Sequence, residues 1–326
     1  MEPNIRCYIS DTSADLIWSV PNSKTESKPG TRSEIHHLET FPVDLIRFLY
    51  LDLSELEKLV AAAVKPLQAA AATGKPECVN RAWRELTKLH KLHPYLICTE
   101  FEWKVRLSEA LNEAGECMLE NPPLERLTAL PDQLRQVQEA GLDLIAQVLD
   151  LDRGEASLQE RMKQYAAKHK REKTPCYQFR KLTTCCEQVN GIYLEILYPQ
   201  EVFDLIDYAL ALCLQKGLRF RVCKNCGRYF AISRSAKAEY CDTFPDENGR
   251  TCRNVGAITA YTKKRENDEV FKTYRREYKK RFARIRAGAL RPDEFYTWSE
   301  QARQMKEALE REEIDLEAFL DWLANS

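Results

Sequence analysis

Hydrophobic residues recur at helical spacing over most of this chain. From Phe41 to Thr73, apolar side chains return every three or four residues, which is the spacing of one face of a helix. Pro66 is expected to end or kink this run, because proline removes one backbone N–H from the helix. The same spacing predicts further helices over 77–92, 95–119, 131–149, 155–171 and 201–216.

Two regions alternate instead, as strands do. Ile5–Ile9 and Ala14–Val20 form one candidate pair of strands, and a polar loop at 21–30 follows them. Cys176–Leu182 and Ile192–Tyr198 form another candidate pair, with Asn190 and Gly191 placed for a turn. We expect the four strands to make one small antiparallel sheet.

The last third begins with two short strands around a cysteine pair, Leu218–Val222 and Tyr229–Ile232. Helices are predicted after them, over 252–264, 267–287, 293–312 and 316–323. The predicted fold class is therefore mainly α with a small antiparallel β-sheet (α+β), followed by a C-terminal four-cysteine zinc-finger module with a helical tail.

A length of 326 residues favours about two domains. Gly217 ends a predicted helix, and the charge changes at the same place. We therefore predict residues 1–216 as a helical domain with a small β-sheet, and residues 217–326 as the four-cysteine zinc module plus the helical tail. A fragment 1–216 is expected to fold without zinc, whereas 217–326 is expected to need it.

The charge is distributed unevenly along the chain. Residues 216–291 hold 21 Lys/Arg against 8 Asp/Glu, although the whole chain has a net charge of only −1. Residues 1–215 and 292–326 are both acidic. The basic block can bind a polyanion, or it can pack against its own acidic neighbours.

Four cysteines form the one cluster with the spacing of metal ligands. Cys223 and Cys226 make a Cys-x-x-Cys-Gly turn, and Cys241 and Cys252 follow with a wider gap. No histidine lies nearby in the sequence, so a closed site would be all-cysteine. We expect a structural Zn²⁺, with an iron–sulfur cluster or unliganded thiols as the alternatives.

The N-terminus has no basic segment followed by an apolar run, and no apolar stretch is long enough to span a membrane. We therefore expect a cytoplasmic protein without membrane contact, whose thiols stay reduced. The other eight cysteines are interpreted as small hydrophobic core residues: Cys7, Cys78, Cys98, Cys117, Cys176, Cys185, Cys186 and Cys213.

The segment 271–286 combines an aromatic stripe with a basic one. At helical spacing, the aromatic residues share a narrow arc and are expected to be core. The cations are interpreted either as an ordinary solvated face or as contacts to nucleic acid. The nucleic-acid interpretation combines two sets, Lys272, Arg275, Arg276 and Lys279 on the helix and Arg219, Arg221, Lys224 and Arg228 on the cysteine hook.

The sequence holds no glycine-rich phosphate loop, no His-Glu-x-x-His and no nucleophile elbow. His90 and His93 are three residues apart on a predicted helix, but no further ligand is evident. They are expected to be ordinary surface or core histidines, and the chain is expected to be no enzyme.

Three segments around the cysteines resemble a known family, namely Phe220–Phe230, Glu239–Asp242 and Thr251–Ala257. With the tail around Tyr274–Lys280, they resemble an uncharacterised bacterial family, common in Firmicutes, that has a C-terminal four-cysteine module and a basic helical tail. More distantly, they are similar to CGNR-type zinc fingers of bacterial transcription regulators, which have a tighter second cysteine pair. The resemblance supports the four ligands and implies no reaction.

The leading hypothesis is a non-enzymatic zinc protein that binds DNA or RNA, in a regulatory or mobile-element accessory role. The alternative is a protein-interaction adaptor with a purely structural zinc site, whose basic face meets an acidic protein surface. Exposure of the basic face, or its coverage by the acidic stretches 109–125 and 300–321, separates the two.

Overall fold

The computed structural model describes residues 4–9, 14–21, 31–38, 41–110, 118–119, 121–189, 191–232, 235–256, 258–259, 269–311 and 313–326. The chain divides into two compact units, Met1–Pro245 and Asp246–Ser326. The predicted fold class is confirmed, because the protein is mostly helical with a small antiparallel sheet. The predicted boundary at 216/217 concerns independent folding and stays a prediction.

The helices of the first unit follow the hydrophobic pattern closely. They are α1 (Val43–Leu49), α2 (Ser54–Thr73), α3 (Pro76–Leu86), α4 (Leu89–Leu92), α5 (Ile97–Ala110), α6 (Leu124–Leu144), α7 (Leu158–Glu172) and α8 (Val202–Gln215). Three short segments join them: the 3-10 turns η1 (Pro94–Leu96) and η3 (Leu151–Arg153), and the π-helical segment η2 (Ile145–Leu149).

Two prolines lie inside helices. Helix α2 continues through Pro66, with Leu59 and Leu67 buried on either side of it. Helix α6 begins at Leu124, before Pro131, so the predicted start at 131 is wrong. In both helices, buried apolar side chains on both sides of the proline offset the lost hydrogen bond, which costs about 3 kcal/mol.

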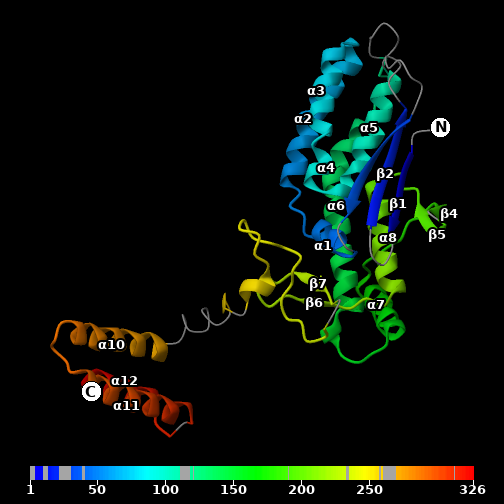
Figure 1. Cartoon of the computed structure of the whole chain (residues 1–326). Helices are drawn as coiled ribbons and strands as arrows, with labels where there is room; N and C mark the ends of the chain where they lie inside the picture. Colours follow the sequence, from blue (N-terminus) through cyan, green and yellow to red (C-terminus); the bar gives the residue numbers. More distant parts are fainter. Residues whose placement is uncertain are drawn as a thin grey trace. The chain divides into compact units, whose positions relative to one another are not determined.

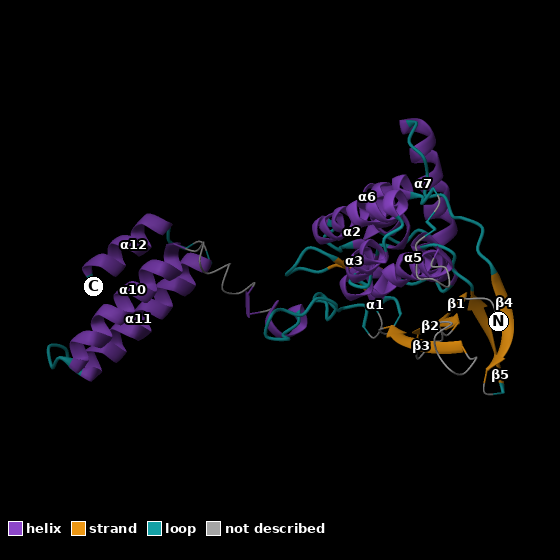
Figure 2. Cartoon of the chain, turned by 90° about the horizontal axis from the view of Figure 1, so that it is seen from above, coloured by secondary structure: helices purple, strands orange, loops and turns teal. Residues whose placement is uncertain are grey.

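A five-stranded antiparallel sheet lies along one side of these helices (Figures 1 and 2). Its strands are β1 (Asn4–Ile9), β2 (Ala14–Pro21), β3 (Thr31–Leu38), β4 (Thr184–Val189) and β5 (Ile192–Leu197), in the order β3-β2-β1-β5-β4. The N-terminal strands therefore join the later hairpin through β1 and β5, as predicted.

The strand predicted at 176–182 is wrong. The partner of β5 is β4, which pairs Val189 with Ile192. A two-residue hairpin loop requires its strands to adjoin it directly, and 176–182 lies too far upstream. That segment instead contacts α8, where the Asp207 carboxylate accepts hydrogen bonds from the Tyr177 hydroxyl at 2.6 Å and from the Arg180 backbone N–H at 2.9 Å.

A second, two-stranded sheet consists of β6 (Phe220–Val222) and β7 (Tyr229–Ala231), as predicted. It packs on the helical part of the first unit. Phe220 is fully buried in the main hydrophobic core, and its strand forms a parallel bridge with Asp150. The hydroxyl oxygen of Tyr50 accepts the Tyr229 backbone N–H at 2.9 Å. The cysteine turn between β6 and β7 is therefore held against the helices.

This packing refines the expected behaviour of fragments. A fragment 1–216 is expected to fold without zinc but to lack Phe220, whose loss from a core costs about 3–5 kcal/mol. A fragment 1–232, which keeps β6 and β7, should therefore be the more stable of the two in urea unfolding followed by circular dichroism. Equal stability of the two fragments would contradict the packing described, and failure of both to fold would contradict the predicted boundary.

In its described part, the second unit has the helices α10 (Glu269–Arg286), α11 (Pro292–Glu310) and α12 (Leu316–Asn325), preceded by a helical segment at 252–256. Phe295, Trp298 and Ala302 of α11 are buried, and Tyr274 and Tyr278 of α10 pack against them. Tyr274 and Tyr278 of the aromatic stripe thus pack in the core, as predicted, whereas the prediction is wrong for Phe282, which is exposed. Phe271 lies among residues whose side chains are outside the described part.

Candidate metal centre

The sulfur atoms of Cys223, Cys226, Cys241 and Cys252 all lie within 4.8 Å of one another. The Cys226 and Cys241 sulfurs are 3.7 Å apart. Tetrahedral Zn–S bonds of about 2.3 Å place their sulfurs about 3.8 Å apart, so this spacing is compatible with a metal ion. The structure thus brings together all four cysteines that the sequence singled out.

The first two ligands lie on a turn fixed by backbone hydrogen bonds. The Gly227 N–H donates to the Cys223 carbonyl at 2.9 Å, and the Cys223 N–H donates to the Arg228 carbonyl at 2.9 Å. Gly227 has a φ of 73°, which residues with a side chain rarely adopt. The glycine of the Cys-x-x-Cys-Gly pattern is therefore required by the turn.

The surroundings of the thiols favour a bound cation. Burial alone raises the pKa of Cys223, but backbone N–H groups of Cys226, Cys241 and Asn225 lower it to about 7. Burial raises the pKa of Cys226, and burial together with the two neighbouring thiolates raises that of Cys241. Several thiolates this close repel one another, and a divalent cation removes that repulsion.

Cys252 is the first residue of a helical segment at 252–256. The Asn254 side-chain oxygen accepts hydrogen bonds from the backbone N–H and the hydroxyl of Thr251, both at 2.9 Å. These bonds fix the chain on both sides of Cys252. Cys223, Cys241 and Cys252 are at most 6% exposed. A site closed in this way by four sulfurs has no open position for a substrate and is typical of a structural metal.

The cations of the cysteine hook contact neighbouring groups of the first unit. Arg221 forms a bidentate ion pair with the Asp152 carboxylate, at 2.8 and 2.7 Å, and donates to the carbonyls of Ala236 and Ala238. Lys224 forms an ion pair with Glu239. One guanidinium nitrogen of Arg219 is buried, without a hydrogen-bond partner among the described residues. Arg221 and Lys224 thus have partners in the chain itself, and the predicted role of the hook cations in nucleic-acid binding stays a prediction.

Arg228 lies over the ring of Phe244, 4.5 Å from its centroid, and beside that of Tyr50. It lines a cavity of about 460 Å³ together with Arg47, and Asp44 and Asp52 line the same cavity. Two carboxylates and two guanidiniums thus line the same surface, so their charges balance and do not by themselves attract a polyanion.

The helix cations differ from those of the hook. Lys272, Arg275, Arg276 and Lys279 are all exposed on α10 and are here named the basic stripe. Their side chains form no ion pair or hydrogen bond with any other residue in the part of the chain that the structure describes. At 100° per residue they occupy one arc of the helix, spaced i, i+3, i+4 and i+7.

The remaining cysteines are only partly core. Cys7, Cys98 and Cys213 are buried, whereas Cys185 and Cys186 on the edge strand β4 are exposed. The interpretation of these two as core residues is wrong, because an edge strand leaves side chains in solvent. Cys117 lies outside the described residues.

The two histidines have ordinary structural partners. His93 is buried, with its Nε2–H donating to the Asp44 carbonyl at 3.0 Å and its Nδ1 accepting the Tyr95 N–H at 3.2 Å. His90 pairs with Glu100 at 2.6 Å.

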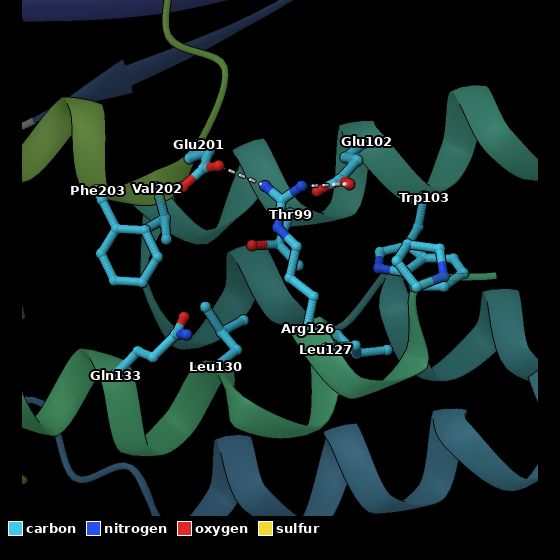
Figure 3. Close-up of a pocket in the computed structure, with 11 residues that line it drawn as sticks. Thr99, Glu102, Trp103, Arg126, Leu127, Leu130, Gln133, Glu201, Val202 and Phe203 are labelled. Carbon is cyan, nitrogen blue, oxygen red and sulfur yellow. Dashed lines mark hydrogen bonds and ion pairs between the residues drawn. The ribbon is translucent and has the colours of Figure 1, made fainter. Parts of the chain in front are cut away.

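A small hollow between α5, α6 and α8 is shown in Figure 3. Arg126 lies across it and pairs with Glu201 at 2.7 Å and with Glu102 at 3.3 Å. The hollow has a volume of about 30 Å³, which accommodates water, because one water needs about 10–15 Å³ by this measure. A volume this small has no room for a substrate. The charged groups of the hollow are also paired to one another.

The comparisons with known proteins agree with the predicted resemblance in part. Residues 174–324 match a family of unknown function (DUF6076), and no curated protein or solved structure matches the chain. The matched segment includes β4, β5 and α8 as well as the cysteines and the helical tail. The resemblance to CGNR-type fingers and the bacterial origin stay predictions. No described helix has both the length and the apolar character needed to cross a membrane.

Proposed function

We propose that this chain is a non-enzymatic zinc protein that binds nucleic acid through the basic stripe of α10. The observation that carries the proposal is the exposure of four cations on one helical face without ion-pair partners among the described residues. Helix α10 holds eight Lys/Arg against two Asp/Glu. A row of exposed cations of this kind is what binding to a phosphate backbone requires.

Acidic residues of the same unit leave this face uncovered. Glu300 and Glu307 pair with Arg303, and Glu313 pairs with Arg311. Glu277 of α10 pairs with Lys280 and Arg281 of the same helix, away from the stripe. Glu300, Glu307 and Glu313 of the acidic stretch 300–321 thus have local partners, which favours the nucleic-acid hypothesis over coverage by these residues.

Zinc is the metal proposed for the four-cysteine site. Four thiolates are soft ligands, and tetrahedral all-sulfur sites select Zn²⁺ or iron–sulfur clusters. The described residues 223–252 place no histidine or carboxylate in the cluster. In this proposal the zinc orders the hook and does no chemistry.

The salt dependence of binding tests the proposal. Replacement of Lys272, Arg276 and Lys279 by glutamine is expected to reduce the log–log slope of affinity for duplex DNA against salt by about two to three units. Each neutralised phosphate contributes about 0.9 to that slope. The measurement is fluorescence anisotropy over a salt series, with zinc content and circular dichroism as controls for folding.

A matched control replaces three other arginines, which pair with carboxylates, and so removes the same amount of positive charge. Arg291, Arg303 and Arg311 are exposed, and all three pair with neighbouring carboxylates. Their replacement by glutamine should leave the slope nearly unchanged. Shallow binding that neither triple variant alters would favour the alternative, an adaptor for an acidic protein surface. No binding at low salt would overturn the proposal.

A further inference from the structure

Two exposed aromatic side chains lie near the loop that joins α10 to α11. Phe282 is 42% exposed and Tyr296 is 71% exposed. Single exposed apolar residues are common on protein surfaces, so the exposure of these two gains meaning only from the cations beside them. These two residues are named the aromatic edge.

The aromatic edge is anchored in the core of the second unit. Phe282 packs on Phe295 with 5.9 Å between ring centroids, and Phe295 contacts Tyr296 at 5.9 Å. Tyr278 stacks on Phe282 at 6.3 Å, with 10° between the ring planes. Because Phe295 is only 3% exposed, these contacts limit the motion of the exposed rings.

Cations adjoin the aromatic edge. The Arg286 guanidinium lies over the Phe282 ring, 5.3 Å from its centroid. Arg286 is seven residues beyond Lys279, so it continues the basic stripe on the same arc of α10. From Lys272 to Arg286 the stripe spans about 21 Å, at about 1.5 Å per residue.

We infer that the ligand of this face is single-stranded nucleic acid, with phosphates on the basic stripe and bases stacked on Phe282 and Tyr296. This inference rests on the proposed function and names its substrate class. A duplex keeps its base faces stacked inside, whereas a single strand presents them to aromatic side chains. Stacking of this kind tolerates any base, because every base has a π-face.

Binding to two forms of nucleic acid tests the inference. The probes are labelled oligothymidine and oligouridine of about 20 nucleotides and a duplex of matching length. This length exceeds the about 4–16 nucleotides that one single-strand-binding fold covers. Single strands should bind at least about tenfold more tightly than the duplex. Electrostatics alone predicts the opposite order, since the duplex has the higher charge density.

The double variant Phe282→Leu/Tyr296→Ser is expected to weaken single-strand binding by about tenfold or more, and duplex binding by less than about twofold. Leucine keeps an apolar side chain against Phe295. A matched control exists in the first unit, where Phe179 is 41% and Tyr193 is 71% exposed. Phe179→Leu/Tyr193→Ser should leave both affinities unchanged.

The outcomes separate the inference from the proposed function. Duplex binding as tight as single-strand binding, with no effect of the aromatic variant, would overturn the inference. In that case, weaker binding by the basic-stripe variant would still support the proposed nucleic-acid binding. Equal weakening of both ligands by the aromatic variant would also overturn it. Absence of binding to every probe would overturn both.

Discussion

Purified protein is expected to carry one zinc ion per chain, and the Cys226→Ser variant is expected to lose it. The four sulfurs are the ligands, so one missing thiolate opens the site to water. Structural zinc contributes about 10 kcal/mol or more to the folding of such a module. The variant should therefore be cut by protease within 217–265 under conditions in which the parent chain resists.

Elemental analysis and limited proteolysis measure this effect. Cys185→Ser is the matched control, because Cys185 is exposed on β4 and lies outside the cluster. It should retain zinc and protease resistance. Full zinc content in Cys226→Ser, or no zinc in the parent chain purified without chelator, would contradict the assignment.

The second large effect is a loss of stability in mild acid through His93. Burial, together with the nearby charge of Arg47, lowers the pKa of His93 to about 4 although its ring hydrogen-bonds the Asp44 carbonyl. The unfolded chain takes up this proton below about pH 6.5, the folded chain only below about pH 4. Between these values the unfolded state binds more protons, so the free energy of unfolding should fall by about 3 kcal/mol as the pH falls.

His93→Gln should remove this component, because glutamine does not titrate and keeps a donor for the Asp44 carbonyl. Urea unfolding of both proteins is compared from pH 7 to pH 4 in EDTA, so that zinc release adds nothing. Burial raises the pKa of Glu100, which acts in the opposite sense in both proteins and cancels in the difference. Identical pH profiles of the two proteins would contradict a neutral buried His93.

Periodicity predicts the helices well because each has one buried face. One error is the start of α6, which continues through Pro131 because buried apolar residues lie on both sides of it. The other errors concern strands, which are defined by backbone pairing. Strand β3 was not predicted because its sequence has no alternation of apolar and polar residues: Ile35 is exposed, and the strand is held by its backbone pairing with β2. The partner of β5 is predicted wrongly at 176–182, because this segment has the aromatic composition of a strand although Tyr177 contacts α8.

The four cysteines could be predicted from their spacing, which is typical of metal ligands, and the structure brings their sulfurs together. The sequence could not predict that the cations fall into two kinds, those of the cysteine hook and those of the basic stripe. Arg221 pairs with Asp152, which is 69 residues away in the sequence. Only the fold shows that the hook cations contact groups of the chain itself while the basic stripe stays exposed.

The most direct test of the central claim is X-ray absorption spectroscopy at the zinc edge on the purified chain. The account predicts four sulfur neighbours at about 2.3 Å and no nitrogen or oxygen in the first shell. A shell of nitrogen or oxygen, or fewer than four sulfurs, would contradict a structural site formed by Cys223, Cys226, Cys241 and Cys252.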